Sequence, residues 1–282
     1  MKVGLSVPLP AYTIDPAFMA SKAEALGFNS IWYAEHPAVP VESKSPFPST
    51  GGEVPWTYSH FTEPYIALAR ASGVTKTIQL GTGITLVPQR HPMILAKEVA
   101  ALDFHSGGRF QFGIGTGWLQ EEVELFGGDF PKRWTQTREA LDAMKAVWTN
   151  DAAGFEGTYY NFPPVRVYPK PMQKPYPPII IGGAAKRVLK RIIEHADGWL
   201  PNRVSPEDLV GHRAELNQLA EAAGRDPKSI RIIVYGQEPD ADLFAALFKA
   251  GADEVVVRPK HVDTEAEMGQ QLEDFARLLI KE

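Results

Sequence analysis

The stretch Arg90–Trp118, RHPMILAKEVAALDFHSGGRFQFGIGTGW, contains one full repeat of a fold that alternates helices with strands. Pro92 suits the first turn of a helix, where the missing N–H of proline costs little. Apolar residues then recur at helical spacing and predict one buried helical face: Ile94, Leu95, Val99 and Leu102. We therefore expect a helix that begins at Pro92 and ends before Gly107.

The second half of this stretch predicts a strand that ends in glycines. Residues 109–114 form a short run typical of a buried strand, and Gly113, Gly115 and Gly117 follow at its end. Glycine lets the backbone approach a ligand closely, so we expect Gly115 and Gly117 to contact a bound molecule. A helix, a tight turn, a strand and a glycine-rich end make one unit of an α/β barrel, whose chemistry lies at that end.

The rest of the chain repeats this alternation. Eight runs are typical of strands, near residues 3–7, 30–33, 77–84, 109–114, 179–181, 198–200, 230–234 and 254–257. Eight strand–helix repeats predict a closed parallel (β/α)8 TIM barrel, with residues 150–175 as an insertion after the fourth helix, forming a hairpin and an extended run. An open doubly wound sheet is disfavoured because residues 6–12 lack its glycine fingerprint. We expect one domain over residues 1–282, closed by a helix over 265–282.

Composition narrows the function. The 282 residues carry 29 Lys and Arg against 34 Asp and Glu, a net charge of −5 without a basic block, which argues against nucleic acid as a partner. There are 0 cysteines, so disulfide and thiolate chemistry are excluded. The chain enters a strand at once and has no apolar run of the ~20 residues that span a bilayer. We expect a cytoplasmic protein that acts on a small molecule, away from membranes.

Several motifs, in this order, resemble the bacterial luciferase-like monooxygenase superfamily, and within it the branch that uses the deazaflavin coenzyme F420. They are Arg90-His91-Pro92, Ala96-Lys97, Leu102-Asp103, Ser106-Gly107-Gly108-Arg109, Gly113-x-Gly115-x-Gly117-Trp118 with Glu121-Glu122, Pro177 to Gly183, and Asp197-Gly198-Trp199. The resemblance covers most of the chain between Ile31 and Arg203. It implies a flavin or deazaflavin coenzyme at the barrel mouth and a homodimer.

Two glycine segments are candidates for holding this coenzyme. Gly182, Gly183, Ala184 and Ala185 follow a strand, and we expect them to open a helix whose free N–H groups bind the phosphate, with help from Arg203. The alternative is a small-residue turn that packs a helix on the sheet. The resemblance implies that Thr82, Gly83 and Ile84 bulge behind the coenzyme ring, with a cis Gly83–Ile84 peptide. The alternative is a plain strand end.

The adjacent residues Glu35 and His36 are the candidates for catalysis. Histidine titrates near neutral pH and can move a proton. The resemblance implies that His36 is the catalytic base and that its neighbour contacts the ring, although relatives often have Asp where Glu35 stands. The alternative is a strand-end histidine bonded to backbone. Neighbouring strand residues point to opposite faces, so both reach the pocket only if the strand has ended.

Other residues are candidates for the pocket wall. Trp118 stands where sugar-phosphate dehydrogenases of the family place a glutamate, so we expect an apolar or aromatic substrate there. We expect Glu121 or Glu122 to reach the coenzyme or to cap a helix, within a turn region over 119–130. The Pro-, Ser- and Gly-rich loop 38–60 should cover the mouth, with Trp56 facing the substrate.

These observations predict an F420-dependent oxidoreductase that transfers a hydride to or from a small organic substrate. An FMN-dependent monooxygenase that uses oxygen is the alternative enzyme, and a coenzyme-binding accessory protein with little catalysis stays open because a fold does not prove turnover. We expect no metal site, since the seven histidines show no paired ligand spacing. No Gly-x-Ser-x-Gly motif of a serine hydrolase is present.

Overall fold

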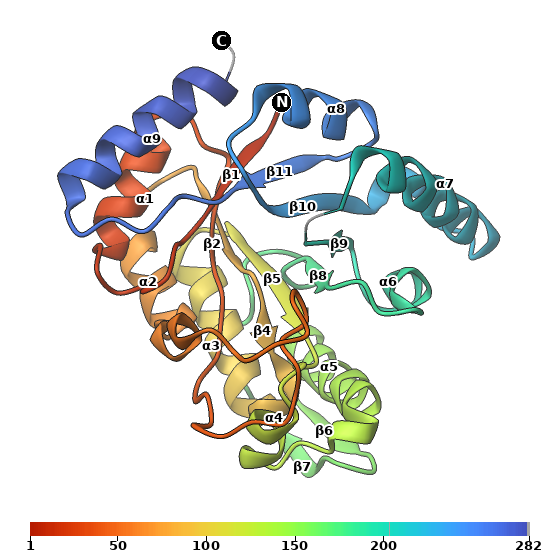
Figure 1. Ribbon diagram of the computed structural model, residues 1–282. Helices are drawn as coiled ribbons and strands as arrows, with labels where there is room; N and C mark the ends of the chain where they lie inside the picture. The colour runs from red at the N-terminus through yellow and green to blue at the C-terminus, as the bar shows by residue number, and fades with distance from the viewer. Residues whose placement is uncertain (203, 281–282) are drawn as a thin grey trace.

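Short buried strands pair in parallel and form one closed sheet in the computed structural model, which describes residues 1–202 and 204–280 (Figure 1). The barrel strands are β1 (Val3–Ser6), β2 (Ser30–Tyr33), β3 (Gln79–Thr82), β5 (Phe110–Gly115), β8 (Ile179–Gly182), β9 (Gly198–Leu200), β10 (Arg231–Gln237) and β11 (Glu254–Val257). β1 pairs with β2 and β11, and β3 pairs with β5 through Leu80 and Phe110, which closes the ring. The predicted eight-stranded parallel barrel is confirmed, and all its strands end on one face.

Helices surround the strands (Figure 1). They are α1 (Pro16–Ala25), α2 (Pro64–Ser72), α3 (Pro92–His105), α4 (Gln120–Leu125), α5 (Arg133–Thr149), α6 (Val188–His195), α7 (Pro206–Ala222), α8 (Ala241–Lys249) and α9 (Glu265–Leu279). A proline begins α1, α2, α3 and α7, and in each case the preceding side chain accepts a backbone N–H of the first turn. No described helix is long and apolar enough to cross a membrane.

Two helix predictions need correction. The segment expected to be a turn region contains α4, a helix of only 6 residues, too short and polar to produce a helical apolar pattern. The last helix ends at Leu279, earlier than expected. Strand three is likewise shorter than expected and is followed by the two-residue strand β4 (Thr85–Leu86), which also pairs with β5.

The insertion after α5 is an antiparallel hairpin of β6 (Ala153–Glu156) and β7 (Asn161–Val165), as predicted. It lies beside α5 (Figure 1). Glu139 of α5 accepts the backbone N–H groups of Thr158, Tyr159 and Tyr160, which fixes the hairpin turn on the helix.

The interior of the barrel is filled by side chains. Its apolar cluster contains Trp32, Ile180, Leu200, Ile233 and Val256, with Ile84 and Tyr235 packed on it. Gly81 makes this possible, because a Cβ there would lie 2.2 Å from the ring of Trp32. Trp32 donates its indole N–H to Ser30, which in turn contacts the buried Glu254. The barrel is therefore a packed core, and open space lies beyond the carboxyl ends of its strands.

Candidate functional site

A cavity of about 450 Å³ lies at the mouth of the barrel. Its wall comes from segments that follow the carboxyl ends of most barrel strands and from the long loop after β2. Five of the predicted site residues line it: Glu35, His36, Gly83, Ile84 and Trp118. Residues that sequence reasoning did not single out also line it, including Tyr58, Phe61, Tyr235 and His261. Asn202 and Arg258, which follow β9 and β11, line it as well.

His36 is held by a buried carboxylate. Its Nδ1 lies 2.7 Å from Glu122 Oε2, and the exposed fractions of the two side chains are 7% and 0%. Glu122 also accepts the backbone N–H of Ala38 at 3.3 Å and the side-chain amide of Gln89 at 3.2 Å. The partner of His36 is thus the side chain of Glu122, 86 residues away in the chain. The alternative interpretation, a histidine bonded to backbone, does not describe this contact.

Aromatic rings surround the imidazole. The ring centroid of His36 lies 5.2 Å from those of Tyr58 and Phe61 and 5.8 Å from that of Trp118. Phe47 packs edge-on against Tyr58 and Trp118. The loop over residues 38–60 therefore supplies part of the cavity wall, as expected. These rings exclude water from the imidazole and offer apolar surface to a substrate.

Trp56 does not share this position. It is 69% exposed, and it lines a separate surface groove formed within its own loop. The expectation that Trp56 faces the substrate is wrong, because the short 3₁₀ helix Trp56–His60 turns the next residues, Thr57 and Tyr58, toward the cavity instead.

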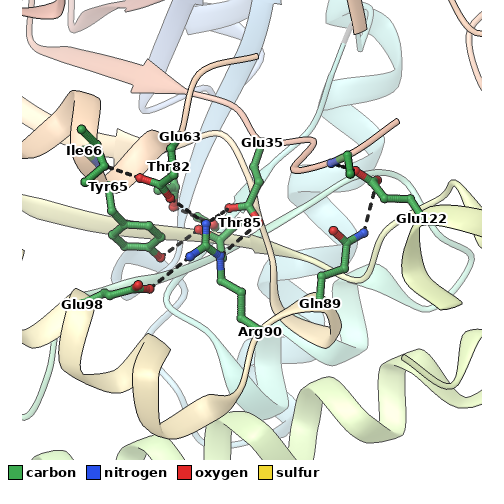
Figure 2. A network of polar contacts seen from close by, with 12 residues as sticks. Glu35, Glu63, Tyr65, Ile66, Thr82, Thr85, Gln89, Arg90, Glu98 and Glu122 are labelled. Atoms are coloured by element: carbon green, nitrogen blue, oxygen red, sulfur yellow. Dashed lines mark hydrogen bonds and ion pairs between the residues drawn. The ribbon is translucent and has the colours of Figure 1, made fainter. Parts of the chain in front are cut away.

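Glu35 belongs to a charged cluster around Arg90 (Figure 2). The guanidinium contacts Glu35 at 3.2 Å through two nitrogens, Glu63 at 2.7 Å and Glu98 at 3.1 Å, and it lies over the ring of Tyr65. Burial raises the pKa of Glu35 to about 7, while Arg90 acts in the opposite direction. Glu35 therefore pairs with Arg90 at the cavity wall, and its catalytic role stays a prediction.

The strand has ended before this pair of residues. β2 stops at Tyr33, and so Glu35 and His36 are free to point to different sides of the same turn. Gln89 and Arg90, also adjacent in the chain, bind Glu122 and Glu35 respectively (Figure 2).

The Gly83–Ile84 peptide is cis, which confirms that prediction. The side chain of Ile84 fills space left by two glycines: a Cβ on Gly115 would lie 2.0 Å from it, and one on Gly182 would lie 2.9 Å from it. Thr82 is buried and donates its hydroxyl to the Gly113 carbonyl at 2.8 Å. Thr82 and Gly115 therefore shape the wall without lining the cavity.

Gly117 and Glu121 also serve the scaffold. Gly117 has a φ of 78°, and a Cβ there would lie 2.6 Å from Val123, so the space at this glycine is already occupied. Although burial opposes it, hydrogen bonds from Ser45, Ser43 and the Lys44 N–H lower the pKa of Glu121 to about 2. The expectation that these two residues contact the coenzyme is corrected, because Glu121 fastens the loop to α4.

The segment predicted to bind phosphate has a different local structure. Gly183 has a φ of 90° with open space around it, and its N–H donates to the Leu200 carbonyl at 3.2 Å. Helix α6 begins only at Val188, so Ala184 and Ala185 lie in irregular backbone and do not open a helix. The segment still follows the carboxyl end of β8, on the same barrel face as the cavity. Arg203 lies outside the described residues.

A family model described as luciferase-like monooxygenase matches residues 16–237. The chain belongs to this family. This luciferase-like protein is 35% identical over 248 residues to an uncharacterized protein, Rv0953c, of Mycobacterium tuberculosis, covering 86% of each chain. It is 29% identical over 185 residues to an F420-dependent glucose-6-phosphate dehydrogenase of Amycolatopsis mediterranei, covering 64% of this chain and 51% of that protein.

A solved structure supports the fold of this luciferase-like protein. Monooxygenase RslO1 from Streptomyces bottropensis superimposes with a TM-score of 0.78 at 21% identity, over 99% of both chains. The motifs that carried the resemblance in the sequence therefore lie in the family's barrel. Members of the family whose names state a function are oxidoreductases or monooxygenases.

Proposed function

We propose that this protein is an oxidoreductase that uses coenzyme F420 and transfers a hydride to or from a small apolar or aromatic organic substrate. The observation that carries the proposal is a cavity with an apolar wall at Gly83–Ile84 and an imidazole, His36, among aromatic rings. The Amycolatopsis relative supports F420 as the coenzyme by its name and similarity.

The size and the wall of the cavity support a planar ring as its ligand. Its volume of about 450 Å³ lies in the range of pockets that hold small molecules and cofactors. Gly83 lets the ring of Tyr235 pack directly on the backbone, because a Cβ there would lie 2.8 Å from that ring, and both residues line the cavity. The Ile84 side chain has no polar atom, so it can pack on a flat ring without an unpaired donor or acceptor.

The residues of the wall have distinct roles in this proposal. Gly83 and Ile84 would support the ring, and the turn after Gly182 would hold the phosphate. A deazaflavin supplies two-electron hydride chemistry, and the protein supplies position and protons. His36 would hold or move the proton at the substrate oxygen, and Trp118, Tyr58 and Phe61 would exclude water. Arg258 and Asn202, which also line the cavity, would orient polar groups of the ligands.

A side-by-side titration of the purified protein with F420 and FMN tests this function. We expect F420 to bind at least about tenfold more tightly, or ~1.4 kcal/mol. Substrate screening under anaerobic conditions should then change the absorbance of bound F420, and an oxygen electrode should record no consumption. Preferential FMN binding with oxygen uptake would identify a monooxygenase. Coenzyme binding without turnover of any substrate by the wild type would favour an accessory protein.

A further inference from the structure

We infer that Glu122 is the positioning residue that locks His36 in a single tautomer, with the proton on Nδ1 and the lone pair of Nε2 available to the cavity. The catalytic consequence rests on the proposed function, whereas the tautomer follows from the described structure alone.

The first observation is the geometry of the pair. His36 Nδ1 and Glu122 Oε2 are 2.7 Å apart, the distance typical of a hydrogen bond with a charged partner. The side chain of Glu122 is fully buried and that of His36 nearly so. A hydrogen bond of this kind is strong where water does not compete, so it can determine which ring nitrogen carries the proton.

The second observation is the set of other partners of Glu122. The backbone N–H of Ala38, which can only donate, points to Oε1. The Gln89 amide N–H points to Oε2. If the oxygen and nitrogen of the Gln89 amide were exchanged, its oxygen would face Glu122 Oε2 and the two acceptors would repel each other. The carboxyl group thus acts as acceptor toward both Ala38 and Gln89, which is the pattern of an ionised carboxylate. An ionised carboxylate has no proton to give, so His36 Nδ1 is the donor in the third contact.

The consequence for the imidazole is directional. With Nδ1–H committed to Glu122, the neutral ring has its lone pair on Nε2, the nitrogen that points away from Glu122. His36 lines the cavity, so Nε2 is the atom that can accept a proton from a substrate hydroxyl and later return it. The opposite tautomer would present an N–H to the substrate and could only donate.

Glu121 provides a matched control for Glu122. Both glutamates lie on α4 and are adjacent in the chain, yet Glu121 binds Ser43, Lys44 and Ser45 of the loop and does not contact His36. Replacing either by glutamine removes one negative charge from the same helix. Only Glu122→Gln introduces an amide that can donate to Nδ1 and favour the other tautomer.

Nitrogen NMR on the full-length, coenzyme-free protein tests the inference directly. The His36 signals are identified by their absence in His36→Asn. In the neutral ring we expect the wild type and Glu121→Gln to show a protonated Nδ1 and an unprotonated Nε2. Glu122→Gln should shift the pair toward protonated Nε2. A wild type with the proton on Nε2, or a mixture that Glu122→Gln leaves unchanged, overturns the inference even if the variant folds poorly.

Kinetics of the coenzyme-loaded protein give the second readout. Glu122→Gln should lower kcat on the order of 10²-fold with little change in substrate KM, because it removes the base and leaves the binding surfaces in place. Equal losses in Glu121→Gln and Glu122→Gln would indicate a general effect of α4 and contradict the positioning role. If the tautomer shifts as expected but no coenzyme reaction is found in the wild type, the proposed function fails and the assignment of the tautomer stands.

Discussion

Two groups of charged side chains flank the turn that follows β2, and they are built differently. Around Arg90, one guanidinium contacts three carboxylates, and its hydrogen bonds are directed to Glu35, Glu63 and Glu98. On the cavity side, one imidazole contacts one carboxylate through Nδ1, and its ring lines the cavity. The comparison teaches that two residues adjacent in the chain can belong to different networks. Glu35 pairs with Arg90 in the first group, and His36 pairs with Glu122 in the second.

The strongest way to break this comparison is to remove the imidazole. His36→Ala should lower turnover by about 10²- to 10⁴-fold, because the group proposed to move the proton is lost, while coenzyme affinity changes little. Steady-state kinetics and a coenzyme titration measure the two effects. His105→Ala, at the far end of α3, is the control and should retain turnover. Normal turnover in His36→Ala would contradict a catalytic role for His36, and the two groups would then not differ in function.

Removing the guanidinium tests the scaffold side. Arg90→Met should lower the free energy of unfolding by about 3 kcal/mol at neutral pH, because it leaves the buried Glu35 without its cation. Urea denaturation measures the loss. Arg70→Met is the matched control, since Arg70 pairs with Asp15 at the surface, where ion pairs contribute little. Similar losses in both variants would mean that burial of the Arg90 cluster has no special effect.

The pH dependence of stability provides a further test of the charged cluster around Arg90. Burial raises the pKa of Glu35 from 4.5 to about 7, so the folded protein binds more protons than the unfolded chain between these values. Stability contributed by the neutral form is therefore present at low pH and lost as pH rises toward 7. Relative to Glu35→Gln, the wild type should lose about 1–3 kcal/mol between pH 5 and 8 in urea titrations. A pH-independent difference would place the pKa of Glu35 in its usual range.

Local signals in the sequence were sufficient to predict most of the fold. Apolar runs mark the strands, and prolines at the first helical position mark four helices, including α3 at Pro92. The same rules failed for α4, which is short and polar and is held by contacts with the loop after β2. A helix of that kind depends on tertiary contacts, which no short window of sequence contains.

The candidate site was predictable in part. His36, Trp118 and the cis Gly83–Ile84 peptide came from the family resemblance, and the structure places all of them in the cavity wall. Glu122 and Arg90 belong to the quoted motifs, but their pairing with His36 and Glu35 was missed because the partners lie 86 and 55 residues apart in the chain. Glycine is ambiguous as well: Gly115 makes room for Ile84, and sequence alone cannot distinguish that from room for a ligand. The homodimer and the phosphate role of Arg203 remain predictions.

The loop over the mouth is anchored at its beginning by two successive residues of α4. Glu122 accepts the N–H of Ala38, and Glu121 holds residues 43–45. Phe47 packs against Tyr58 and Trp118, but the exposed residues 48–53 beyond it can change in composition without touching the contact between His36 and Glu122. Diversification of substrate range in evolution, or in directed evolution, can be concentrated in that stretch while the pair of His36 and Glu122 stays in place.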